Sequence, residues 1–133
     1  MIDIEELARS AIDCGFHIHK RLGPGLLESA YEVVLEAALL KRGLSVERQK
    51  PIGIRLDDIL IADAFRADLV VQGRLVIEVK SVERTAPVHA KQLLTYLRLM
   101  EQPVGLLMNF GCETFREGLK RVVNGPSGFT PAR

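Results

Sequence analysis

The chain has 133 residues, of which 47% are hydrophobic and 26% are charged, so it is long and apolar enough to bury the core of a single domain. This composition excludes a disordered chain, and no apolar run reaches the roughly 18 residues of a membrane-spanning helix. The formal net charge of +1 gives no global basic field. It weakens a nucleic-acid hypothesis without excluding it, because an acidic metal site would offset basic residues in the sum.

Cysteine usage and the first residues indicate a cytoplasmic location. Cys14 and Cys112 are too few and too far apart for a disulfide framework or a zinc site, which favours a reducing compartment. The N-terminus is acidic, unlike the basic start of a signal peptide. We therefore expect a cytoplasmic protein that does not bind membranes.

The first half of the chain predicts two helices followed by strands. Apolar residues at helical spacing, capped by Asp3, predict the first helix, and Gly43 is suited to end the second. Pro51 favours an edge position for the strands that follow. The expected elements are a helix at 3–22, a break at 23–25, a helix at 26–42, one or two strands at 44–54, a turn at 57–58 and a short strand at 59–61.

The second half predicts a hairpin, a helix and a buried strand. The expected elements are a hairpin at 66–80, a loop at 81–87, a helix at 88–100, a strand at 104–110, an ambiguous segment at 115–123 that is either a helix or, over 119–123, an edge strand, and a flexible tail at 125–133. This order predicts one α/β domain over residues 1–124, with a mixed central sheet flanked by helices.

Ionisable side chains interrupt the two apolar strands of the predicted hairpin. Burying such groups is costly unless they are paired or bind a metal, so a strand that keeps them needs a reason. Residues two apart in a strand share a face, so Glu78 and Lys80 project together. A tight turn at Gln72-Gly73 can bring Asp68 beside them.

Two carboxylates beside an ammonium are suited to phosphodiester hydrolysis. Asp68, Glu78 and a backbone carbonyl, that of Val79, would form a hard oxygen site for Mg²⁺ or Mn²⁺, which can activate a bound water. Lys80 would orient that water or neutralise developing charge. The alternative from spacing alone is a surface salt bridge, worth ~0–1 kcal/mol.

Three helical residues have both a structural and a functional interpretation. The carboxylate of Glu28 suits the start of a helix, and spacing alone favours that role over a reach inward to the acidic site. Gln92 and Tyr96 share one helix face, which fits boundary packing or the binding of a substrate phosphate.

Several motifs resemble a known family. The set Ala67-Asp68…Glu78-Val79-Lys80 resembles the signature of the PD-(D/E)xK nuclease superfamily. The stretch from Gly25 to Tyr31, Gly-Leu-Leu-Glu-Ser-Ala-Tyr, resembles the defining motif of the GxxExxY proteins, a family placed in that superfamily. Further similar segments, in the same order, are 65–68, 92–97, 108–111 and 120–121.

The resemblance implies a restriction-endonuclease-like core and assigns roles to residues. It makes Asp68 and Glu78 metal ligands, Lys80 the catalytic lysine and Glu28 the helix carboxylate of the site, which reverses the interpretation of Glu28 from spacing. It matches Gln92 and Tyr96 to a helix motif found behind the lysine strand. The superfamily's proline before the aspartate is Ala67 here, a position that shapes the strand and carries no chemistry. Further candidates for substrate binding are Arg66, His89 and Lys91.

Two functions are therefore expected as alternatives. The first is a Mg²⁺-dependent nuclease acting on DNA more than RNA, with single or branched strands favoured because nothing resembles a separate sequence-reading module. The second is a catalytically silent domain of the same fold that binds nucleic acid or protein. A homodimer is a reasonable expectation for so small a nuclease-like domain, since one copy presents little surface to a long polymer.

Overall fold

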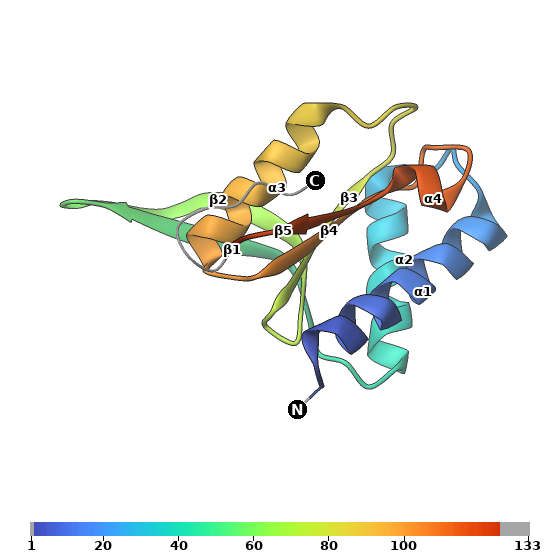
Figure 1. Ribbon diagram of the computed structural model, residues 1–133, viewed down its shortest axis with the longest axis horizontal. Coiled ribbons are helices and arrows are strands. Elements are labelled where there is room, and N and C mark those ends of the chain that lie inside the picture. Colours follow the sequence, from blue (N-terminus) through green and yellow to red (C-terminus); the bar gives the residue numbers. More distant parts are fainter. Residues whose placement is uncertain (1, 126–133) are drawn as a thin grey trace.

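The computed structural model describes residues 2–125, which form four helices and five strands (Figure 1). In chain order these are α1 (Ile4–Leu22), α2 (Glu28–Lys41), β1 (Val46–Leu56), β2 (Ile59–Val71), β3 (Leu75–Lys80), α3 (Pro87–Met100), β4 (Val104–Asn109), α4 (Phe115–Gly118) and β5 (Leu119–Val123). The predicted tail at 125–133 lies outside the described residues apart from Gly125. Among the described helices, none combines the length and the apolar character that crossing a membrane requires.

The five strands form one mixed sheet in the order β1-β2-β3-β4-β5. Strands β3 and β4 are parallel and are joined by α3, whereas every other neighbouring pair is antiparallel. Strand β1 lies at an edge, where the missing N–H of Pro51 is tolerated. The predicted α/β domain with a mixed sheet and flanking helices is confirmed.

Helices cover both faces of the sheet, with α1 and α2 on one side and α3 on the other (Figure 1). Alternate residues of the central strands supply the two cores, as strand geometry requires. In β3, Leu75, Ile77 and Val79 pack with α1 and α2, whereas Val76 packs with Leu93 and Leu97 of α3. Glu78 and Lys80 therefore project from the face that α3 covers.

The helix starts differ by one or two residues from those predicted, for local reasons. Asp3 caps α1, as predicted, by accepting the N–H of Glu5. Helix α2 begins at Glu28, not at Leu26, because the hydroxyl of Tyr31 holds the preceding turn. That hydroxyl donates to the carbonyl of Gly23 and accepts the N–H of Leu26, so it links both ends of the turn between α1 and α2.

Every predicted strand region forms strand, with ends shifted by one or two residues in β1 and β4, and the main difference lies in β2. The short strand at 59–61 is not separate, because β2 continues from Ile59 through the hairpin to Val71. No glycine or proline lies between 59 and 71 to interrupt it. The turn at Gln72-Gly73 is confirmed: both residues have positive φ, and the N–H of Arg74 donates to the carbonyl of Val71.

The ambiguous segment at 115–123 is both a helix and a strand. Thr114 and Glu117 form a capping box that starts the single turn of α4. The chain then extends at Leu119 and pairs antiparallel with β4 as far as Val123. The alternative of an edge strand at 119–123 is therefore confirmed, and the helix is limited to the single turn before it.

Candidate active site

Two carboxylates meet where strands β2 and β3 separate. Asp68 and Glu78, here called the carboxylate pair, lie just beyond Leu69 and Ile77, the last registered residues of the ladder. The N–H of Asp68 donates to Glu78 Oε2, and the N–H of Val79 donates to Asp68 Oδ2, both at 2.9 Å. Each carboxylate thus accepts a main-chain N–H of the other strand, and these reciprocal bonds hold the acids together.

Burial raises the pKa of both members of the carboxylate pair. Glu78 is only 4% exposed, and this burial, together with the charge of Asp68, raises the pKa of Glu78 to about 8. Burial also raises the pKa of Asp68, against the hydrogen bond from Val79, and the charge of Glu32 adds to the rise. Within residues 2–125, neither acid forms an ion pair with a basic side chain.

Lys80 is the basic side chain whose charge acts on both members of the carboxylate pair. It lies on the same face of β3 as Glu78, two residues further on. Its charge lowers the pKa of both Asp68 and Glu78, although not enough to offset their burial. Its side chain is partly exposed and makes no ion pair within 4.0 Å in the described part of the chain. The ammonium is therefore available to a group that enters beside the acids.

A cleft of about 520 Å³ lies between the start of helix α2 and Asp68 of the carboxylate pair. Glu28, which is exposed at the first position of α2, lines this cleft together with Asp68. The cleft thus places Glu28 on the Asp68 side of the site, as the resemblance implied and spacing alone did not. The lining residues are Leu26, Leu27, Glu28, Ser29, Glu32, Gln49, Asp68 and Ser81.

Glu32 and Gln49 belong to this cleft and were not predicted as site residues. Glu32 is 4% exposed. Its Oε1 accepts hydrogen bonds from Nε of Arg48 at 2.9 Å and from Nε2 of Gln49 at 2.8 Å. Gln49 also donates to Asp68 Oδ1 at 3.2 Å. Neighbouring strand residues normally point to opposite faces, but the positive φ of Gln49 turns both side chains toward Glu32.

A sequence signal for Glu32 existed. It follows Tyr31 directly and lies four residues before Glu36 on a helix whose buried positions are Tyr31, Glu32, Leu35 and Leu39. A carboxylate beside a buried stripe needs partners, and this requirement could have identified it. The role of Gln49 gave no such signal, because it depends on a backbone conformation that glutamine rarely adopts.

On the other face, Tyr96 of α3 lies close to the carboxylate pair. Burial, and then the charges of Glu78 and Asp68, raise the pKa of the Tyr96 phenol. Its ring stacks on Phe65 with centroids 3.9 Å apart and planes 9° from parallel. Gln92 lies one helical turn before Tyr96 and is exposed.

The three remaining candidates lie apart from the acids or have other contacts. Arg66 is exposed and pairs with Asp63 at 3.2 Å. His89 accepts the N–H of Ala86 through Nδ1 and so caps the start of α3. Lys91 is exposed in the first turns of the same helix. Within residues 2–125, no hydrogen bond or ion pair joins any of these side chains to the carboxylate pair.

The donor set of the carboxylate pair fits a hard divalent cation. Two carboxylates and the nearby main chain of Val79 offer oxygen ligands, and Mg²⁺ is usually held by one or two carboxylates with waters completing its shell. Their excess negative charge lacks an ion-pair partner in residues 2–125. Across that same range, no group of three acidic, histidine or cysteine side chains is close enough to hold a metal. Among the described residues, Glu28 therefore does not complete a three-residue cluster with the carboxylate pair.

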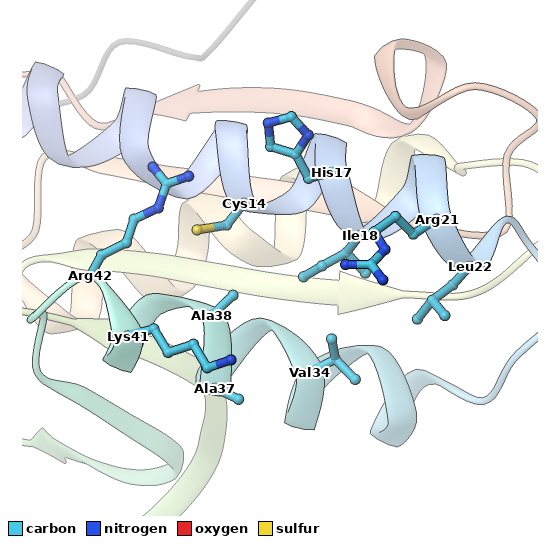
Figure 2. Close-up of a pocket in the computed structure, with 10 residues that line it drawn as sticks. All are labelled: Cys14, His17, Ile18, Arg21, Leu22, Val34, Ala37, Ala38, Lys41 and Arg42. Atoms are coloured by element: carbon cyan, nitrogen blue, oxygen red, sulfur yellow. The ribbon is translucent and has the colours of Figure 1, made fainter.

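A second cavity, of about 540 Å³, lies between α1 and α2 (Figure 2). Its floor is apolar and includes Ile18, Val34 and Ala38, with Arg21 and Lys41 nearby. No Asp or Glu lines it. It therefore lacks the acids that metal-dependent hydrolysis requires, and the cleft at Asp68 remains the candidate site.

Comparison with known proteins gives one family match. The family described as the PD-(D/E)XK nuclease superfamily matches residues 5–122, which include the carboxylate pair, Lys80 and both flanking helical motifs. Neither the curated proteins nor the solved structures include a significant match to the chain.

Proposed function

The chain belongs to the PD-(D/E)XK nuclease superfamily, and on that basis we propose that it is a Mg²⁺- or Mn²⁺-dependent nuclease that hydrolyses phosphodiester bonds. The observation that carries this proposal is the reciprocal carboxylate pair, in which Glu78 is buried and Asp68 is half-buried, without a basic ion-pair partner in residues 2–125. A silent domain would have no reason to keep two neighbouring acids uncompensated, since an arginine could neutralise them.

Within the superfamily we assign the chain to the GxxExxY proteins. This finer assignment rests on the motif Gly25, Glu28 and Tyr31. The contacts of two of these residues support it, because Tyr31 is fully buried and fixes the turn before α2, and Glu28 lines the cleft one helical turn earlier. The motif thus couples a structural tyrosine to a carboxylate beside the site.

Asp68 and Glu78 would hold the cation, with the carbonyl of Val79 and the carboxylate of Glu28 as further candidate ligands. A divalent cation supplies Lewis acidity toward a phosphoryl oxygen and lowers the pKa of bound water. The pKa of Glu78, raised to about 8, means that Glu78 must lose a proton to act as an anionic ligand.

The remaining residues of the site would bind and orient the substrate. The ammonium of Lys80, beside both acids, would neutralise the phosphate and orient the attacking water. Tyr96 and Gln92 on α3 would hydrogen-bond a phosphate, and Arg66, His89 and Lys91 are further candidates for contacts with the backbone of the polymer. We propose DNA before RNA, and single-stranded or branched substrates before a specific duplex.

A substrate panel tests this function. Labelled single-stranded, duplex and branched DNA, and matching RNA, are incubated with wild-type protein, Glu78→Gln, Lys80→Met and the distant control Glu113→Gln, with Mn²⁺ or with EDTA. We expect cutting by wild type and control only with metal, reduced by about 100-fold or more in both site variants. Equal cutting by all four proteins would mean contamination and would refute the proposal.

The silent domain remains the alternative, and calorimetry with Mg²⁺ and Mn²⁺ distinguishes it. Binding by wild type and its loss in Glu78→Gln support the nuclease. Absence of binding, together with absence of cutting on every substrate, would favour a domain of this fold that acts in nucleic-acid or protein assembly.

A further inference from the structure

The cavity of about 540 Å³ between α1 and α2, here called the α1–α2 cavity, has no part in the proposed nuclease function (Figure 2). Its floor is formed by apolar side chains of both helices, including the buried Cys14 and Ile18 of α1 and Ala38 of α2. Ala38 is a small residue at a position where a larger side chain would fill part of the gap. The volume is within the roughly 300–1,000 Å³ that is typical of sites for small molecules.

The α1–α2 cavity is bounded at both ends along the helices. Arg42, which follows α2, donates hydrogen bonds to the hydroxyl of Ser10 and to the carboxylate of Asp13, so it bridges the two helices at one end. At the other end α1 stops at Leu22, and the chain returns to α2 through residues 23–27. A partner helix would need an open groove along its length. The shape therefore favours a small molecule.

The charges around the α1–α2 cavity indicate an anionic ligand. No Asp or Glu lines it, whereas four basic side chains do, namely His17, Arg21, Lys41 and Arg42. Asp13, just outside the lining, lies 3.3 Å from His17 and pairs with Arg42. Within residues 2–125, Arg21 and Lys41 form no ion pair and no side-chain hydrogen bond. Two cations therefore border the apolar floor without a counter-ion in this part of the chain.

The helix dipole explains part of this pattern, because Arg21 and Lys41 lie in the last turns of α1 and α2. That role requires only a position near a helix end and does not require the side chains to border a cavity. Both nevertheless line it, as do Ile18 and Val34 (Figure 2). Apolar walls reduce the screening by water, so an anion in the cavity would be attracted more strongly than one on open surface.

We propose that the α1–α2 cavity binds a small amphiphilic anion, with an apolar body against Ile18 and Ala38 and a carboxylate, sulfonate or phosphate group beside Arg21 or Lys41. Arginine and lysine both donate charge-assisted hydrogen bonds to such oxyanions. The cavity shares no lining residue with the cleft at Asp68. It is therefore a second site, separate from the candidate active site.

Fluorescence titration of the full chain with anilinonaphthalenesulfonate tests this proposal, because the probe has an apolar body and one anionic group. Phenylnaphthylamine, which has the same body without the sulfonate, is the neutral control probe. Wild type at pH 7 should bind the anionic probe saturably and about tenfold more tightly than the neutral one. The double variant Arg21→Met with Lys41→Met should lose this preference, because it loses two partly exposed ion pairs, and should bind the neutral probe as wild type does.

Matched variants locate the bound probe. Lys20→Met with Arg116→Met removes the same charge from exposed residues outside the α1–α2 cavity, and should bind both probes as wild type does. Ala38→Leu fills part of the cavity, and should weaken the binding of both probes by about tenfold. Leu60→Ser removes apolar surface from another exposed position, on β2, and should leave both affinities unchanged. Circular dichroism and urea midpoints verify that each variant is folded.

Three results would overturn the proposal. The first is the absence of saturable binding of the anionic probe up to about 1 mM. The second is equal affinity for this probe in wild type and in the Arg21→Met, Lys41→Met variant. The third is binding that Leu60→Ser weakens and Ala38→Leu does not. None of these measurements involves a divalent metal or cleavage, so failure here leaves the proposed nuclease function untouched.

Discussion

Replacing Glu78 by glutamine should stabilise the metal-free protein at alkaline pH. Glutamine has nearly the shape of glutamate, and its carbonyl oxygen can still accept the N–H of Asp68. What the substitution removes is a buried acid whose ionisation is opposed by burial and by the charge of Asp68. The prediction is therefore a change in the pH dependence of stability more than a change at one pH.

The magnitude follows from the difference between the folded and unfolded pKa values of Glu78. The folded pKa is about 8 and the model value is 4.5, so folding favours the protonated form. The contribution of this group is fully present below the unfolded pKa and is lost as pH rises through the folded one. Between these limits the free energy of unfolding falls by about 1.4 kcal/mol per pH unit. From pH 5 to pH 8 the loss is at most about 4 kcal/mol, and coupling to Asp68 shares it between the two acids.

Urea denaturation in EDTA, at half-unit steps from pH 5 to pH 8.5, measures this slope. Wild type should lose stability across the range, Glu78→Gln should lose much less, and the two proteins should differ most near pH 8. Glu113→Gln changes the same atoms on an exposed side chain and should follow wild type. Wild type and Glu78→Gln with equal slopes, or a wild type that becomes more stable up to pH 8, would refute the reasoning.

Three further substitutions test the framework around the site by urea denaturation. Asn109→Ala should destabilise by about 3 kcal/mol, because the fully buried side chain of Asn109 accepts the N–H groups of Val82 and Gly111, and a loss below about 1 kcal/mol would contradict this. Gly118→Ala should cost about 3 kcal/mol or more, because a Cβ there overlaps the carbonyl oxygen of Asn109, and wild-type stability would show that the backbone adapts easily. Tyr31→Phe should cost about 1–2 kcal/mol by freeing the turn at Leu26, and an unchanged midpoint would mean that this turn holds without the hydroxyl.

The sequence predicted the elements well where local signals were strong. Helical spacing and the Asp3 cap located α1, and Gln72-Gly73 located the hairpin turn, because both depend on residues close in sequence. The division of β2 was wrong because an exposed, charged stretch around Asp63 resembles a loop. Only its antiparallel pairing with β1 makes it one strand, and that pairing is a tertiary contact.

The sequence predicted that the acids of the candidate site lie close together, and it did not predict the hydrogen bonds that hold them. Period-two alternation on β3 joined Glu78 to Lys80, and the turn brought Asp68 opposite Glu78. That each carboxylate accepts a main-chain N–H of the other strand depends on where β2 and β3 separate, which no local pattern indicates. The links of Gln49 to both Asp68 and Glu32 likewise depend on its positive φ.

The electrostatics of the carboxylate pair predict how a bound divalent cation would change the stability of the protein. The charge of Glu32 raises the pKa of Asp68, and the charges of Asp68 and Glu32 raise the pKa of Glu78. In the absence of a cation, ionisation of the pair therefore weakens the fold as pH rises. Well-packed apolar residues at these positions would remove that penalty, since isolated buried charges are rarely retained for stability. A divalent cation bound to both acids would reverse the sign of the interaction, because it favours their ionised forms. It follows that Mg²⁺ or Mn²⁺ should stabilise the protein more at pH 8 than at pH 6, and that this difference should vanish in Glu78→Gln.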